Sequence, residues 1–117
     1  AFQNRPCYTE PGKVTVCNVD SAGVDPVRDW LSGHPGVSVG AMGTRAKQLA
    51  ADHQINLDFT YGVIDKCILK ALLGEGSVIL TTESMVQRIF DRVRDFSREN
   101  GVNIPVSLLP ETSENTE

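Results

Sequence analysis

The sequence predicts a single α/β domain, with helices packed on a mixed central sheet of about four to five strands. Two observations lead to this class. From about residue 55 onward, the spacing of apolar residues changes in the order strand, helix, strand, helix, strand. The chain also has 117 residues, of which 40% are hydrophobic and 22% charged, as expected of one globular domain.

The first half of the chain carries four expected elements. The β-branched run 13–19 (KVTVCNV) indicates a strand. A short helix is expected to open at Asp25, directly before a proline, and to end at Gly33. Residues 37–42 (VSVGAM) indicate a second strand, and Thr44 can cap the helix that follows it. The order of these elements fits an α/β domain.

The middle of the chain supplies the pattern on which the sheet type depends. Residues 55–60 (INLDFT) alternate apolar and polar, which predicts a strand with one face less buried than the other. Helical spacing returns over residues 63–73, and the short apolar run 77–80 predicts a strand buried on both faces. Because some strands show one-sided patterns, we expect a mixed sheet.

The last helix and the last strand are expected near the end of the chain. Ser84 and Gln87 form a capping-box sequence before a helix of about four turns, which Gly101 ends. Residues 102–109 predict a closing extended segment, and Pro105 places it at a sheet edge because proline cannot donate a ladder hydrogen bond. That edge could pair with a second copy in a homodimer.

The ends of the chain differ in composition from its body. Residues 1–12 are predicted to be an irregular lead-in, residues 13–109 the domain, and residues 110–117 an acidic disordered tail. The net charge of −4 argues against a nucleic-acid partner, which would require a basic face. No apolar run is long enough to span a membrane. The expected setting is soluble and cytoplasmic, without membrane contact.

The sequence contains no recognisable catalytic or metal-binding motif. Three cysteines at these spacings predict neither a disulfide framework nor a metal site. Neither His34 nor His53 lies in a setting typical of a catalytic base. Residues 39–44 (VGAMGT) could hold an anion at a helix start, but lack the lysine and glycine spacing of a phosphate-binding loop. We therefore expect no catalytic residues, no metal and no cofactor, and lean against an enzyme.

One ligand pocket can still be predicted from general rules. Open α/β sheets bind small molecules beyond the carboxyl ends of their strands. Here those ends offer Asp20, Thr82 and Glu83. A small-molecule-binding or enzymatic domain with its pocket at these residues is one alternative function, and a domain of unknown function is another.

A family resemblance gives the main hypothesis. Residues 55–60, the helical stretch 63–73 (VIDKCILKALL), the apolar strand 77–80 and the helix over 84–96 resemble, in that order, a sulfate-transporter and anti-sigma-factor-antagonist (STAS) domain. The resemblance extends over about residues 37–110. It implies a non-enzymatic, regulatory domain that binds a protein partner.

The resemblance also implies where the partner would bind. Its contact surface would be the start of the 63–73 helix and the preceding loop, with Tyr61, Gly62, Asp65, Lys66 and Cys67 as the partner-binding residues. In family members that switch by phosphorylation, a serine stands where this chain has Cys67. The phosphorylation switch is therefore expected to be absent.

Overall fold

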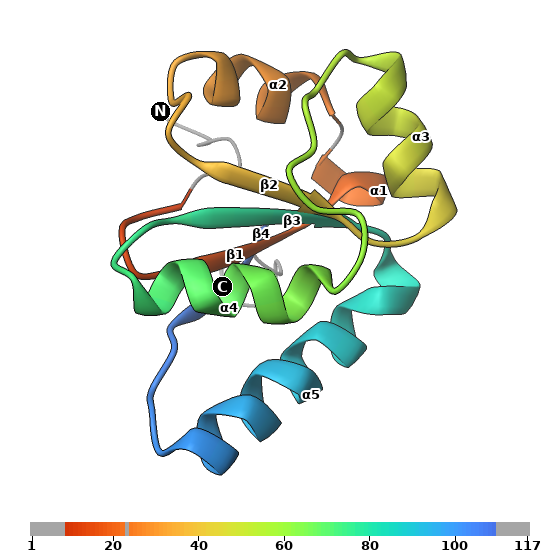
Figure 1. Cartoon of the computed structure of the whole chain (residues 1–117). Helices are drawn as coiled ribbons and strands as arrows, with labels where there is room; N and C mark the ends of the chain where they lie inside the picture. The colour runs from red at the N-terminus through yellow and green to blue at the C-terminus, as the bar shows by residue number, and fades with distance from the viewer. Residues whose placement is uncertain (1–8, 23, 110–117) are drawn as a thin grey trace, which may run out of the picture.

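The computed structural model describes residues 9–22 and 24–109 of the chain, shown in Figure 1. Four strands and five helices are formed by these residues. In chain order they are β1 (Val14–Asn18), α1 (Val19–Ala22), α2 (Asp25–Ser32), β2 (Ser38–Ala41), α3 (Thr44–Asp52), α4 (Val63–Leu72), β3 (Ser77–Thr81), α5 (Glu83–Asn100) and β4 (Val106–Leu109).

The four strands form one sheet in the order β2-β3-β1-β4, and all its pairings are parallel. Val14 of β1 lies opposite Ser77 of β3 on one side and Val106 of β4 on the other. The predicted α/β class and single domain are confirmed. The expected mixed sheet is wrong, because every strand returns to the sheet through a helical crossover that keeps its direction.

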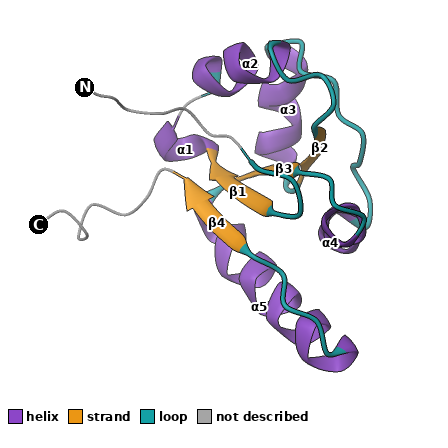
Figure 2. Ribbon diagram, turned by 90° about the vertical axis from the view of Figure 1, so that its left-hand side faces the viewer, coloured by secondary structure: helices purple, strands orange, loops and turns teal. Residues whose placement is uncertain are grey.

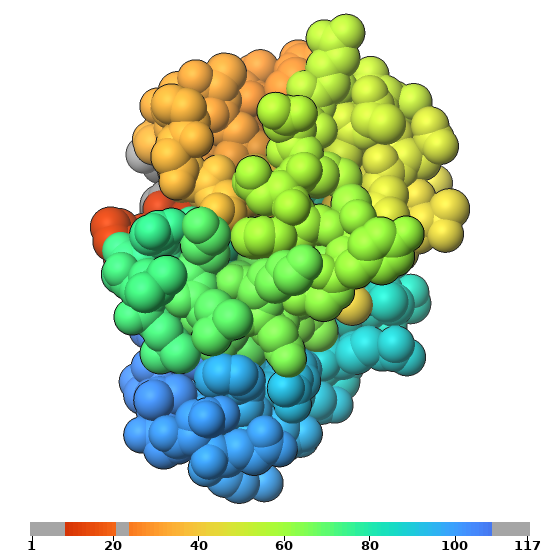
Figure 3. Space-filling model, viewed as in Figure 1, coloured from red at the N-terminus to blue at the C-terminus, as the bar shows by residue number. Residues whose placement is uncertain are grey.

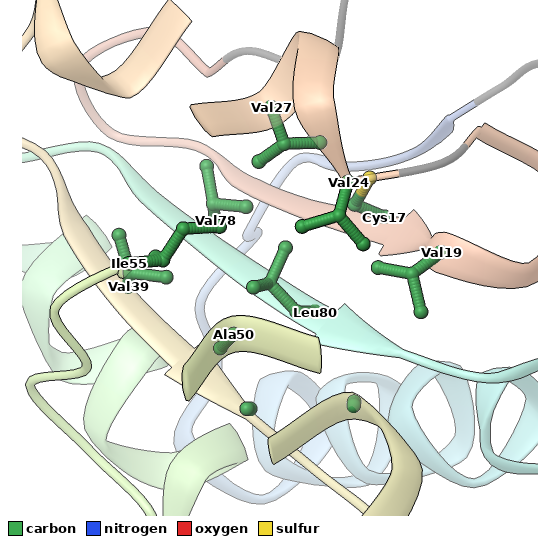
Figure 4. Packing of buried hydrophobic residues seen from close by; sticks show 11 residues of the cluster. Cys17, Val19, Val24, Val27, Val39, Ala50, Ile55, Val78 and Leu80 are labelled. Atoms are coloured by element: carbon green, nitrogen blue, oxygen red, sulfur yellow. The ribbon is translucent and has the colours of Figure 1, made fainter. Parts of the chain in front are cut away.

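The sheet is the middle of three layers (Figures 1 and 2). Helices α2 and α3 cover one face, and α4 and α5 cover the other. The first face buries Cys17, Val39 and Leu80, among other residues (Figure 4). The second face buries Val16 and Ile79 against apolar residues of α4 and α5. Because both faces are covered, β1 and β3 are buried at every position.

The predicted strand over residues 55–60 is a loop that lies along β2. Only one bridge joins it to the sheet, between Gly40 and Phe59. The Asp58 side chain accepts a hydrogen bond from the Val39 amide (2.9 Å), and the Asp58 amide donates to the Val39 carbonyl (2.8 Å). Alternating side chains pack into the core from this extended loop without ladder pairing, so the alternation predicted a strand wrongly.

Gly40 makes this close approach possible. A Cβ atom at position 40 would lie 2.5 Å from Cγ1 of Val63, at the start of α4. No real side chain tolerates such a contact without movement of its neighbours. Gly40 therefore allows the loop and α4 to pack directly on the strand.

The ends of the helices differ slightly from expectation. Helix α5 begins at Glu83 with Thr82 as N-cap residue, and no side-chain capping hydrogen bond is formed there. The capping box of Ser84 and Gln87 is therefore wrong. At the other end, Gly101 adopts the left-handed conformation (φ 63°) and ends the helix, as predicted.

β4 lies at the edge of the sheet, directly after Pro105, as expected for this segment. Pairing of this edge with a second copy stays a prediction. Most of the predicted lead-in (residues 1–8) and the acidic tail (residues 110–117) lie outside the described residues. Within the described ranges, no helix is both long and apolar enough to cross a membrane.

Candidate functional site

After the two central strands, β1 and β3, the chain continues to opposite faces and opposite edges of the sheet. After β1 it passes into α1 and α2 on one face and reaches β2 at one edge of the sheet. After β3 it passes into α5 on the other face and reaches β4 at the opposite edge. The carboxyl ends of β1 and β3 therefore flank a topological switch point, the place where open α/β sheets bind ligands.

A buried amide joins the two loops at this point. Asn18, the last residue of β1, is only 5% exposed. Its Nδ2 donates a hydrogen bond to Oε1 of Glu83 (2.7 Å), and its Oδ1 accepts one from the Asp20 amide (3.0 Å). Both ends of the amide are satisfied, so Asn18 fixes the start of α1 relative to the start of α5.

Two carboxylates and one guanidinium surround this amide. Nε of Arg45, in the first turn of α3, donates to Oδ1 of Asp20 at 2.8 Å. The Glu83 amide lies 3.5 Å from the other oxygen of Asp20. Asp20, Arg45 and Glu83 are all solvent-exposed, so their remaining hydrogen-bonding capacity faces the surface. We call these three residues together with Asn18 the edge cluster.

The three predicted pocket residues end up at this edge. Asp20 and Glu83 come into contact although they lie 63 residues apart, and Thr82 immediately precedes Glu83 as the half-buried N-cap residue of α5. Asn18 and Arg45 were not predicted. Asn18 is an amide at the end of a strand whose other residues are β-branched residues and a cysteine, which is a signal that sequence reading could have used.

Two hollows lie at other places in the molecule. One, of about 300 Å³, lies between the end of α2 and the 54–58 loop and includes Arg28, His34 and Gln54 in its lining. The other, of about 390 Å³, follows α5 and the segment 103–106. Neither is lined by Asp20, Thr82 or Glu83.

The residues predicted to bind a partner all lie around the start of α4, but they differ in solvent exposure. Tyr61 is 79% exposed, Gly62 precedes the helix in the left-handed conformation (φ 60°), and Lys66 is exposed. Arg92 of α5 forms a bidentate pair with Asp65, in which Nε donates to Oδ1 at 2.7 Å and Nη2 donates to Oδ2 at 2.9 Å. The hydrogen bonds from Arg92 hold the pKa of Asp65 below its usual 3.8.

Cys67 corrects one of these predictions. Its side chain is fully buried under the sheet, so it cannot contact a partner in this conformation. Burial raises the pKa of the Cys67 thiol to about 11. Cys17 is also a buried free thiol, and Cys7 lies outside the described residues. Within the described residues, no group of His, Cys, Asp and Glu side chains could hold a metal ion.

The fold and the edge cluster together define a three-layer, all-parallel α/β domain with a polar switch point. The chain is 41% identical over 98 residues to the energy-coupling factor transporter ATP-binding protein EcfA2 of Methanospirillum hungatei. It is 38% identical over 98 residues to a putative ABC transporter ATP-binding protein of Methanosarcina mazei. Each match covers 84% of this chain but only 25% and 22% of the relatives, so the chain spans about a quarter of their length.

No family model and no solved structure matches the chain. The relatives overturn the STAS hypothesis and, with it, the non-enzymatic regulatory function that it implied. The physical reason is that the resemblance rested on apolar spacing, which many α/β domains share. Its starting point, the 55–60 strand, is also a loop.

The relatives are ATP-binding proteins, yet this chain carries no phosphate-binding loop. No stretch of it reads Gly-x-x-x-x-Gly-Lys-Ser/Thr. The turn between β2 and α3, with Gly43 at φ 95°, is the nearest approach, and it lacks the lysine. The similarity therefore covers a segment of 98 residues in which this chain has no such motif.

Proposed function

We propose that this chain is a small-molecule-binding α/β domain that works with the ATP-binding protein of a membrane transporter. The observation that carries the binding role is the edge cluster, which brings Asn18, Asp20 and Glu83 together at the switch point. The names of the relatives support the transporter setting. In this setting the partner is a protein, and the domain lies on the cytoplasmic side of the membrane, where ATP is available.

The chemistry of the edge cluster favours a particular class of ligand. Asp20 and Glu83 present carboxylate oxygens that accept hydrogen bonds, whereas Arg45 is the one cation among them. Such a surface suits a small molecule rich in hydroxyl or amino groups, because carboxylates bind sugar hydroxyls and amines well. Nucleosides and other polyhydroxylated molecules are therefore the first candidates. A triphosphate would meet two carboxylates and no lysine of a phosphate-binding loop.

The proposal is tested by thermal unfolding of the purified chain with a panel of adenosine, ADP, ATP, monosaccharides and polyamines. A ligand at about 100 times its Kd stabilises the folded chain by roughly 2.7 kcal/mol, which raises the Tm by several degrees. Asp20→Asn and Glu83→Gln keep the shapes of the side chains but remove their charge. We expect either change to weaken the ligand-induced shift, while Glu75→Gln at the opposite end of the sheet leaves it unchanged.

Two results would contradict this function. One is a panel in which no compound changes the Tm. The other is a ligand whose stabilisation survives both edge substitutions, since that ligand binds elsewhere. In the second case, the hollow beside Arg28 and Gln54 would be the site to examine.

A further inference from the structure

Helix α4 exposes apolar side chains near its carboxyl end. Val63, Ile64, Cys67, Ile68 and Ala71 are buried on the face that the sheet covers. The outer side carries Leu69 and Leu72 beside the charged residues Asp65, Lys66 and Lys70, and Leu73 follows directly as the C-cap residue. Leu72 and Leu73 follow Leu69 by three and four positions, so the three leucines lie together at the end of the helix.

The exposed apolar side chains lie along α4, with three leucines at its carboxyl end and Tyr61 just before its start. Leu69, Leu72 and Leu73 are 52%, 46% and 74% exposed, and Tyr61 in the loop before α4 is 79% exposed. Among the described residues, these four are the large apolar side chains that face solvent. Figure 3 shows α4 crossing the front of the molecule with nothing laid over it. We call these four residues the α4 face. Concentrated exposure of this kind marks an interaction surface.

We infer that the α4 face docks onto the rest of a transporter ATP-binding protein. This inference rests on the proposed transporter setting. The matched segment is 25% of one relative and 22% of the other, so about three quarters of each polypeptide lies outside it and is available to cover this face. A domain within a longer chain normally buries such apolar surface against its neighbour.

The charges beside the α4 face indicate what the covering surface carries. Lys66 is exposed one turn before Leu69, and its Nζ lies 5.6 Å from the centre of the Phe59 ring. Nζ of Lys47 lies 5.4 Å from the centre of the Tyr61 ring. No ion pair to either lysine is formed within the described residues. The covering surface is therefore apolar opposite the leucines and acidic opposite Lys47 and Lys66.

The test uses a chimera in which this chain replaces the matched segment of M. hungatei EcfA2. In a Cys7→Ser background, a single cysteine is introduced by Leu73→Cys on the α4 face or by Arg88→Cys on the exposed side of α5. Maleimide labelling is timed in the isolated chain and in the chimera. We expect the labelling rate at position 73 to be at least tenfold lower in the chimera than in the isolated chain. The labelling rate at position 88 should differ by less than twofold between the two proteins.

A second variant tests the same face through stability. Leu73→Gln should leave the Tm of the isolated chain within about a degree, because the side chain is exposed, and should lower the Tm of the chimera by several degrees. Equal labelling at both positions, or equal effects of Leu73→Gln in both proteins, would overturn the inference. A chimera in which the inserted segment unfolds separately, at the Tm of the isolated chain, would also overturn it, because a docked segment is stabilised by its neighbour.

Two further outcomes separate the alternatives. Labelling at position 73 that slows in the isolated chain as its concentration rises would identify a second copy as the occupant and overturn the inference. The proposed ligand site is tested independently of these results, because its thermal-shift test uses the isolated chain and substitutions at Asp20 and Glu83. Loss of ligand binding with position 73 still protected would leave docking supported and refute only the ligand site.

Discussion

The side chain of Asn18 donates a hydrogen bond to the carboxylate of Glu83 across 65 residues of sequence, at 2.7 Å. This contact joins the carboxyl ends of the two central strands at the point where the chain departs to opposite faces. The amide is nearly buried and uses both of its polar atoms. It therefore fixes the geometry of the edge cluster on which the proposed function depends.

Loss of this amide should destabilise the domain. Asn18→Ala removes two hydrogen bonds from a nearly buried position, and we expect it to lower the free energy of unfolding by about 1–3 kcal/mol. Urea unfolding followed by circular dichroism measures the change. Asn56→Ala, at an exposed loop position, serves as the control and should change stability by less than about 0.5 kcal/mol. An effect of Asn18→Ala no larger than that of the control would show that the contact contributes little to the fold.

Gly40 should tolerate no side chain. Gly40→Ala places a methyl group 2.5 Å from Val63, so we expect a loss of about 1–3 kcal/mol in unfolding free energy as α4 or the 55–60 loop moves away from β2. Gly36→Ala is the matched control, because nothing lies within 4 Å of its Cβ position. Similar stability of the two variants would mean that the packing of α4 on β2 is looser than described.

Replacing Gln54 with glycine should stabilise the domain. It adopts a left-handed conformation (φ 60°) just after α3, where the Ile55 amide donates to the Ala50 carbonyl and ends the helix. Gln54→Gly removes the strain of a side chain in this conformation and should raise the unfolding free energy by about 0.5–1 kcal/mol. Gln48→Gly inside α3 should instead lower it by about 1 kcal/mol. A stability loss in both variants would contradict this account.

The Asp65–Arg92 pair should couple α4 to α5 in a pH-dependent way. A double-mutant cycle with Asp65→Asn and Arg92→Gln should give a coupling energy below about 1 kcal/mol at pH 7, since both groups are partly exposed and water screens them. The lowered pKa of Asp65 means that the coupling is present above pH 3.8 and is lost as the pH falls through the folded-state value.

The control for this pair is Asp91–Arg94, an exposed pair at 3.3 Å within α5, which should show weaker coupling. Coupling between Asp65 and Arg92 that persists when the carboxyl is protonated would show that the charge interaction is not its source.

Much of the fold follows from burial patterns that are visible in the sequence. Ser77–Thr81 forms a strand buried on both faces, and Val63–Leu72 forms a helix, because continuous and helically spaced apolar runs leave few alternatives. The 55–60 segment shows the limit of this reasoning. Alternation reports which side chains face the core, and it does not report whether the backbone finds a strand partner. Asp58 and Gly40 determine that outcome through tertiary contacts.

The candidate site, like the fold, could be predicted from the sequence only in part. Asp20 and Glu83 could be predicted because polar residues after parallel strands gather at one edge of a sheet. The contact of Asn18 with Glu83 and that of Arg45 with Asp20 depend on strand order, which places β1 beside β3 and which local spacing does not encode. The STAS resemblance failed for a related reason, since apolar spacing alone does not distinguish one α/β family from another.

The most direct test of the central claim is amide chemical-shift mapping of the isotope-labelled chain with the compound that raises its Tm most. A ligand at the switch point should move the amide signals of Asn18, Asp20, Thr82 and Glu83 and leave those of Val37 and Ile55 beside the α2 hollow unchanged. Shifts confined to the signals beside that hollow, with the four edge amides unmoved, would contradict the claim.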